Sequence, residues 1–249
     1  MLERIHNALE QRRYRWFNRR QTSIRFDSGI VSFTFDDFPA TAAKEGAELL
    51  EKQGWRGTFY LAPGLLDKDT AVGRVSSLRD LERLHRRGHE IGNHTYSHFR
   101  CQNARKSTLR REIQSSMQEL ERFDGGRNFA LPFGAYDASA LNYLSGRFDT
   151  IRTVQKGVNS GDSDLNLLKA NPIYQSTELE TLRSLVDQVK AARGWLIFYT
   201  HDISASPSEF GCTADRLHTV LNWVSQAGLT VHTVAETYEL LNRGQQSVN

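Results

Sequence analysis

Strand-like and helix-like segments alternate along the chain from residue 30 onward, and this alternation limits the fold more than any other feature. Runs of β-branched and aromatic residues bounded by Gly, Pro or polar residues predict strands at 30–35, 57–61, 89–91, 127–131, 150–154, 195–200 and 229–233. Helical periodicity predicts helices at 40–53, 78–87, 108–123, 137–144, 179–192, 213–227 and 234–241. Such alternation is typical of parallel strands joined by helical crossovers. We therefore expect an α/β fold, a distorted (β/α)7-type barrel in a single domain.

The composition excludes several classes of protein. No apolar run approaches the roughly 20 residues of a membrane-spanning helix, and the N-terminus lacks the apolar region of a secretory signal. We therefore expect a cytoplasmic protein in which Cys101 and Cys212 are reduced thiols. Neither a GxGxxG fingerprint nor a P-loop is present, so a nucleotide cofactor is not indicated.

The net charge of +3 is unevenly distributed. Residues 1–25 hold seven Arg and two Glu, which gives +5, so the remainder sums to 3 − 5 = −2. Because the residues after 25 carry no excess positive charge, a nucleic-acid partner is not expected. We divide the chain into a basic amphipathic N-terminal helical extension (1–22) and a catalytic domain (23–249). The extension either rests on an anionic membrane surface or packs against the domain or a protein partner; the oligomeric state is not indicated.

Polar residues gather where the predicted strands end: Asp36-Asp37, His94 with His98, Pro132-Phe133, and His201-Asp202. The carboxyl ends of the strands form the active face of α/β barrels. Four segments that are distant in sequence are therefore expected to meet at one mouth.

The residue types at this mouth suit a metal ion. His94 and His98 are spaced i, i+4, so on a helical turn both imidazoles can share one cation. Side chains of adjacent strand residues point apart, so one of Asp36 and Asp37 can hold the metal while the other faces a water. Two imidazoles and one carboxylate suit Zn²⁺ and leave a position for water, and Co²⁺, Ni²⁺ or Fe²⁺ fits the same ligands.

Four motifs carry a resemblance to a known family. They are Thr34-Phe35-Asp36-Asp37, the stretch from His94 to His98, the stretch from Phe129 to Gly134, and the stretch from Leu196 to Asp202. In this order they resemble the polysaccharide deacetylases of carbohydrate esterase family 4, which share the nodulation-type deacetylase homology domain. The resemblance covers about residues 29 to 240 and implies a distorted (β/α) barrel.

The resemblance also implies roles for individual residues. Asp36 would be the general base and His201 the general acid, and Asp37, His94 and His98 would be metal ligands. Substrate and oxyanion contacts would come from the backbone N–H of Phe133 and from Tyr199. Hydrolysis of an amide needs these functions, because water must be activated, the oxyanion stabilised and the leaving amine protonated.

This chain departs from the family pattern at several positions. Ala130 stands where many members carry an Arg paired with the base, so we expect Asp36 to lack a positive neighbour and to have a higher pKa than in those members. Tyr199 stands where many carry Leu. The Asp-Trp motif has no clear match: either Asp162 or Asp164 orients His201, or that stretch is a solvated loop.

The sequence therefore predicts a metal-dependent deacetylase that hydrolyses the acetamide of an N-acetylated sugar or glycan precursor. Two alternatives stay open: a C–N hydrolase of a small non-sugar amide, and a non-catalytic glycan-binding relative of the fold.

Overall fold

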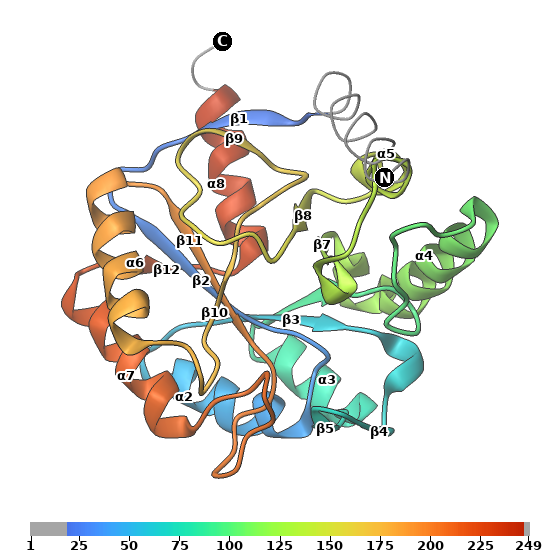
Figure 1. Ribbon diagram of the computed structural model, residues 1–249, viewed down its shortest axis with the longest axis horizontal. Helices are drawn as coiled ribbons and strands as arrows, with labels where there is room; N and C mark the ends of the chain where they lie inside the picture. Colours follow the sequence, from blue (N-terminus) through green and yellow to red (C-terminus); the bar gives the residue numbers. More distant parts are fainter. Residues whose placement is uncertain (1–18, 247–249) are drawn as a thin grey trace, which may run out of the picture.

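A curled parallel sheet forms the centre of the molecule (Figure 1). The computed structural model describes residues 19–246, and for 125, 245 and 246 it describes the backbone alone. The main sheet has the order β10-β11-β2-β3-β6-β7-β8, and β12 also pairs with β2. Its strands are β2 (Ile30–Phe35), β3 (Thr58–Leu61), β6 (Glu90–Asn93), β7 (Asn128–Ala130), β8 (Thr150–Arg152), β10 (Asn171–Pro172), β11 (Trp195–Thr200) and β12 (Thr230–Val231). The predicted barrel-like α/β class is confirmed.

Helices cover the outside of this sheet (Figure 1). They are the π-helical η1 (Ala42–Gly46) with α2 (Ala47–Lys52), then α3 (Leu78–Arg86), α4 (Lys106–Leu120), α5 (Ala138–Ser145), α6 (Leu179–Ala192), α7 (Ala214–Gln226) and α8 (Val234–Gln246). Short 3₁₀ turns lie at η2 (Pro63–Leu65), η3 (Glu121–Gly126) and η4 (Pro132–Gly134). Asp137 caps α5 by accepting a hydrogen bond from the backbone N–H of Ala140 (2.9 Å). Within residues 19–246, no helix combines the length and apolarity needed to cross a bilayer.

The two central strands, β2 and β11, set the position of the functional residues. All six residues of each strand are buried, and they pair in parallel from Trp195 opposite Ile30 to Thr200 opposite Phe35. Alternate β2 side chains, including Phe33, join the apolar cluster beneath the helices. Because the two strands end level with each other, the residues that follow them emerge side by side.

The N-terminal boundary lies close to a small second sheet. β1 (Gln21–Ile24) pairs antiparallel with β9 (Gly161–Asp164), so the boundary expected after residue 22 falls inside β1. Arg20 donates hydrogen bonds to the Phe148 carbonyl (2.6 Å) and the Tyr238 hydroxyl (3.1 Å). Residues 1–18, which hold most of the predicted amphipathic extension, lie outside the described residues.

The segment 165–172 joins the two edges of the curled sheet. Its Leu168 N–H donates to the carbonyl of Ile151 in β8, and its last two residues form β10 beside β11. A short hairpin, β4 (Asp69–Thr70) and β5 (Gly73–Arg74), follows β3 and η2 along the chain. The segment 165–172, for which the sequence patterns predict neither a strand nor a helix, therefore contacts both edges of the curled sheet.

Candidate active site

All seven residues singled out by sequence line one cavity of about 480 Å³ at the carboxyl ends of the strands. They are Asp36, Asp37, His94, His98, Phe133, Tyr199 and His201. The expectation that four distant segments meet at one mouth is thus met by the fold.

The two aspartates reach the same cavity because the chain leaves the strand geometry at Asp36. Asp37 and the following Phe38 have left-handed backbone angles (φ 62° and 56°), which are uncommon for residues other than glycine. Adjacent side chains of a continuing strand would point to opposite faces. The left-handed turn instead directs the Asp37 carboxylate into the cavity beside that of Asp36, which is only 4% exposed.

Asp37, His94 and His98 form a set of converging metal-ligand atoms. One ligand atom from each lies within 4.8 Å of the other two. The Asp37 Oδ1 atom is 3.5 Å from His94 Nε2 and 3.2 Å from His98 Nε2. This buried oxygen accepts no hydrogen bond from residues 19–246. Two imidazoles and a carboxylate in this arrangement fit a divalent cation with nitrogen and oxygen ligands.

His94 is held in the form that binds metals. Its Nδ1 lies 2.8 Å from the carbonyl oxygen of Ala130, which fixes the proton on Nδ1 and leaves the lone pair on Nε2. Burial, together with the charge of His98, lowers the pKa of His94 to about 4. The imidazole is therefore neutral at neutral pH, and its Nε2 lone pair faces Asp37.

His94 and His98 lie on a loop, and the expected helical turn between them is absent. Thr95 and His98 both have left-handed backbone angles (φ 63° and 57°). The Thr95 hydroxyl accepts a hydrogen bond from the Phe99 N–H (2.7 Å). Glu112 of α4 clamps the middle of the loop: it accepts hydrogen bonds from Tyr96 N (3.2 Å), Ser97 N (2.9 Å) and the Ser97 hydroxyl (3.0 Å). These contacts hold the loop in a shape in which both His94 and His98 line the same cavity.

The expectation that Asp36 lacks a positive neighbour is wrong. Arg152, at the end of β8, donates a hydrogen bond from Nη2 to Asp36 Oδ2, and the Arg152 side chain is fully buried. Arg152 is the register partner of Ala130 on the adjacent strand, so the cation comes from the neighbouring position of the sheet. Burial alone would raise the pKa of Asp36, but the charge of Arg152 holds it below its ordinary value.

Sequence reasoning missed Arg152, although a signal was present. The predicted strand at 150–154 contains an Arg within an otherwise apolar and β-branched run. A charged residue on a barrel strand is rarely buried unless it is paired. Its partner is 116 positions away in sequence, and no local pattern connects the two.

His201 is oriented by a backbone carbonyl. Its Nδ1 lies 3.1 Å from the Phe210 carbonyl oxygen, and its Nε2 lies 3.8 Å from Asp37 Oδ2. The loop after β11 is closed by Asp202, which accepts hydrogen bonds from the N–H and the hydroxyl of Ser208. The Nδ1 atom of His201 carries a proton toward the Phe210 carbonyl, and the Nε2 atom on the other side of the ring points into the cavity.

Neither Asp162 nor Asp164 orients His201. Both lie on β9, paired with β1. Asp164 Oδ1 instead accepts hydrogen bonds from the backbone N–H groups of Arg20 (3.1 Å) and Asn166 (3.0 Å). The stretch is therefore a structural sheet, which differs from both sequence interpretations.

Aromatic side chains form much of the cavity wall. Phe133, in the left-handed conformation (φ 58°, ψ 10°), is 62% exposed, and its ring centroid is 4.3 Å from that of His98. Tyr199 is nearly buried and packs edge-on against Tyr174 (5.6 Å between centroids). Tyr174 and Phe210, which the sequence analysis did not select, also line the cavity. An aromatic wall beside a polar centre suits the apolar face of a sugar ring.

Comparisons with known proteins agree with this geometry. Residues 24–146 match the family model described as polysaccharide deacetylase. A chitooligosaccharide deacetylase from Azorhizobium caulinodans is 27% identical over 126 residues, which cover 49% of this chain and 56% of that protein. A chitin deacetylase from Arthroderma benhamiae is 22% identical over 189 residues, covering 66% of this chain and 48% of that protein. The chain thus spans about half the length of the curated relatives it matches.

Two solved structures share the fold. A peptidoglycan N-acetylglucosamine deacetylase aligns with a TM-score of 0.62 at 18% identity, covering 88% of this chain and 92% of that one. A family 4 acetyl xylan esterase from Clostridium thermocellum, in complex with a cobalt ion, aligns with a TM-score of 0.59 at 22% identity, covering 85% and 91%. The motifs, the curled barrel and the match over residues 24–146 agree with membership in the polysaccharide deacetylase family.

Proposed function

We propose that this protein is a metal-dependent deacetylase that hydrolyses the acetamide of an N-acetylated sugar or glycan precursor. The observation that carries the proposal is the convergence of Asp37, His94 and His98 beside a carboxylate, Asp36, that is kept ionised by a buried arginine. The family membership and the chitooligosaccharide and chitin deacetylase names of its relatives support the choice of substrate class.

The ligand set would hold one divalent ion, with zinc as the metal proposed. Such an ion supplies Lewis-acid polarisation of the amide carbonyl and lowers the pKa of water. His94 contributes Nε2, because its Nδ1 proton is committed to the Ala130 carbonyl. His98 contributes Nε2, which lies 3.2 Å from Asp37 Oδ1.

Asp36 would take the proton from water. Its Oδ2 is bound by Arg152, whereas its buried Oδ1 accepts no hydrogen bond from residues 19–246. One oxygen therefore anchors the carboxylate, and the other remains able to accept a proton. The low pKa keeps Asp36 ionised before the reaction, as a general base requires.

His201 would protonate the leaving nitrogen. The Phe210 carbonyl holds the proton of Nδ1, so the protonated imidazole donates from Nε2, on the cavity side. The turn at Phe133 would place its backbone N–H beside the oxyanion, and Tyr199 would pack against the substrate.

The test is to measure metal content and turnover in the same preparation. The protein should bind one zinc ion per chain and release acetate from N-acetylated chitooligosaccharides when it is reconstituted with zinc. Acetylated xylan and small acetamides complete the substrate panel. If only the small acetamides are hydrolysed, the substrate is a small non-sugar amide and the proposed sugar substrate is wrong. If the protein binds metal but hydrolyses none of the substrates, the proposal that it is an enzyme is contradicted.

A further inference from the structure

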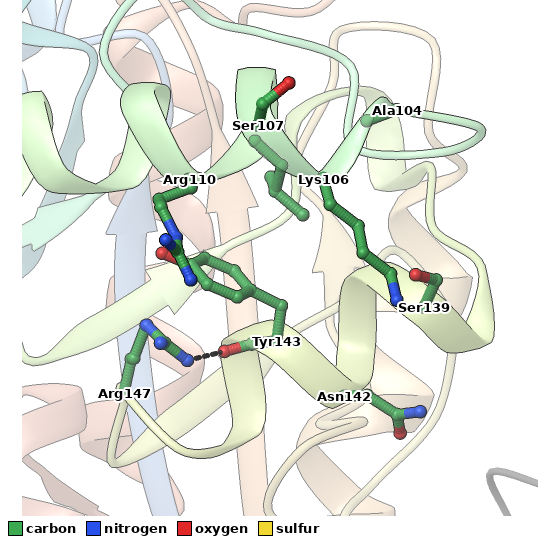
Figure 2. A pocket seen from close by; sticks show the side chains of 9 residues that line it. Ala104, Lys106, Ser107, Arg110, Ser139, Asn142, Tyr143 and Arg147 are labelled. Carbon is green, nitrogen blue, oxygen red and sulfur yellow. Dashed lines mark hydrogen bonds between the residues drawn. The ribbon is translucent and has the colours of Figure 1, made fainter.

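A second cavity, of about 570 Å³, lies on the outer surface between the first turns of α4 and the helix α5 (Figure 2). Three cationic side chains line it: Lys106 and Arg110 from α4, and Arg147 just after α5. It shares no lining residue with the active-site cavity. We call this second cavity the basic groove.

The positive charge of the basic groove is not neutralised by the protein. None of its three cations forms an ion pair with a carboxylate among residues 19–246, and its lining contains neither Asp nor Glu. Lys106 and Arg110 are four positions apart on one helix, where like charges repel. All three side chains are exposed, so they are available to a ligand. The groove therefore favours an anion.

One of the cations is held in a fixed orientation. The Arg147 guanidinium donates from Nη1 to the Tyr143 carbonyl (2.6 Å), and its Cζ atom lies 3.7 Å from the centroid of the Tyr143 ring. Figure 2 shows Arg110 and Arg147 near this ring, while Lys106 extends from α4 toward the Ser139 hydroxyl of α5. A cation already ordered by its own protein loses less conformational entropy when it binds a ligand.

We propose that the basic groove binds a phosphoryl group, carried either by a soluble molecule or by a lipid headgroup. Cations approaching from two helices, together with the Ser139 hydroxyl toward which Lys106 extends, match a tetrahedral anion with several acceptor oxygens. A carboxylate, by contrast, has two oxygens and would be satisfied by one arginine guanidinium. The side chain of Leu109 and the Tyr143 ring add an apolar surface for whatever the phosphoryl group is attached to. The site is independent of the proposed deacetylase chemistry.

The test compares two triple variants of the full chain that remove the same charge. The groove variant changes three lining residues: Lys106→Gln, Arg110→Gln and Arg147→Gln. The control variant changes three exposed cations elsewhere: Lys52→Gln, Arg79→Gln and Lys190→Gln. Thermal unfolding checks that both fold. Binding is measured by calorimetry with inorganic pyrophosphate at low salt, and by sedimentation with phosphatidic acid vesicles against phosphatidylcholine vesicles.

The proposal predicts that the groove variant loses about tenfold or more in affinity, while the control variant changes by about twofold or less. If the groove variant binds both pyrophosphate and the vesicles more weakly than the control variant does, a soluble phosphoryl group suffices as the ligand. If only its binding to the vesicles is weaker, the site is assigned to a lipid headgroup. Equal losses in the two variants, or no loss in the groove variant with either probe, would overturn the proposal. An unchanged rate of acetate release by the groove variant would show that the proposed catalytic centre is separate.

Discussion

Replacing Arg152 by Met should destabilise the protein in a way that depends on pH. Arg152 is fully buried and Asp36 is 4% exposed, so neither charge can be transferred to water when its partner is removed. Breaking a buried ion pair by removing one member costs roughly 3–5 kcal/mol. The Arg152 Cζ atom also lies 5.3 Å and 4.9 Å from the ring centroids of Tyr60 and Tyr199. We therefore expect a loss in the upper part of this range at pH 7.

The sign of the pH dependence follows from Asp36. In the wild type its pKa is lowered on folding, so it contributes stability above its unfolded pKa, and that stability is lost as the pH falls through the folded pKa. In Arg152→Met, burial acts without the compensating cation and raises the pKa. The variant should then lose stability as the pH rises from about 4 toward neutrality. The gap between wild type and variant should be widest at pH 7 and narrower near pH 5.

Urea unfolding followed by tryptophan fluorescence measures this gap, with metal removed from both proteins by a chelator. The double variant Asp36→Asn, Arg152→Met is the matched control, because it removes both charges together. It should be more stable than Arg152→Met alone at pH 7. A loss that is equal at the two pH values, or a double variant less stable than the single one, would refute the assignment of Arg152 as the counter-ion of Asp36.

Five further predictions follow from the structure. His94→Ala should abolish stoichiometric zinc while keeping the thermal unfolding profile cooperative, and normal metal content in that variant would contradict the ligand assignment. Activity should be bell-shaped in pH, and Asp36→Asn should keep its metal but lose roughly 10²–10⁴-fold in turnover. His201→Ala should slow amides more than activated esters, whose leaving groups need no proton; equal losses on the two substrates would remove its role as the acid. Glu112→Ala should weaken zinc binding roughly tenfold or more, because its three hydrogen bonds hold the loop that carries His98; an unchanged zinc affinity would show that the loop is held without it. Removing residues 1–18 should leave turnover on a soluble substrate intact, whereas removal through residue 24 should also destabilise the fold, because β1 pairs with β9; equal stability of the two truncated chains would contradict that role of β1.

Local sequence patterns are enough to predict the class of fold and the residues that make up the candidate site. Alternation of strand and helix patterns predicts a parallel sheet, because each local pattern reports its own element. The ranges 30–35, 179–192 and 195–200 match the observed elements to the residue. Asp37, His94 and His98 were also identifiable, since each stands directly at or shortly after the end of a predicted strand.

The arrangement of the site depends on tertiary contacts that local patterns do not contain. Asp37 shares a cavity with Asp36 because of a left-handed backbone turn, which residue type does not reveal. His201 is oriented by the Phe210 carbonyl, and a backbone oxygen leaves no mark in the sequence. Arg152 supplies the charge that Ala130 lacks because the two are register partners on adjacent strands. Sequence patterns describe local elements, whereas the pairing of parallel strands brings residues that are far apart in the chain into contact, and the charge balance of the active site depends on that pairing.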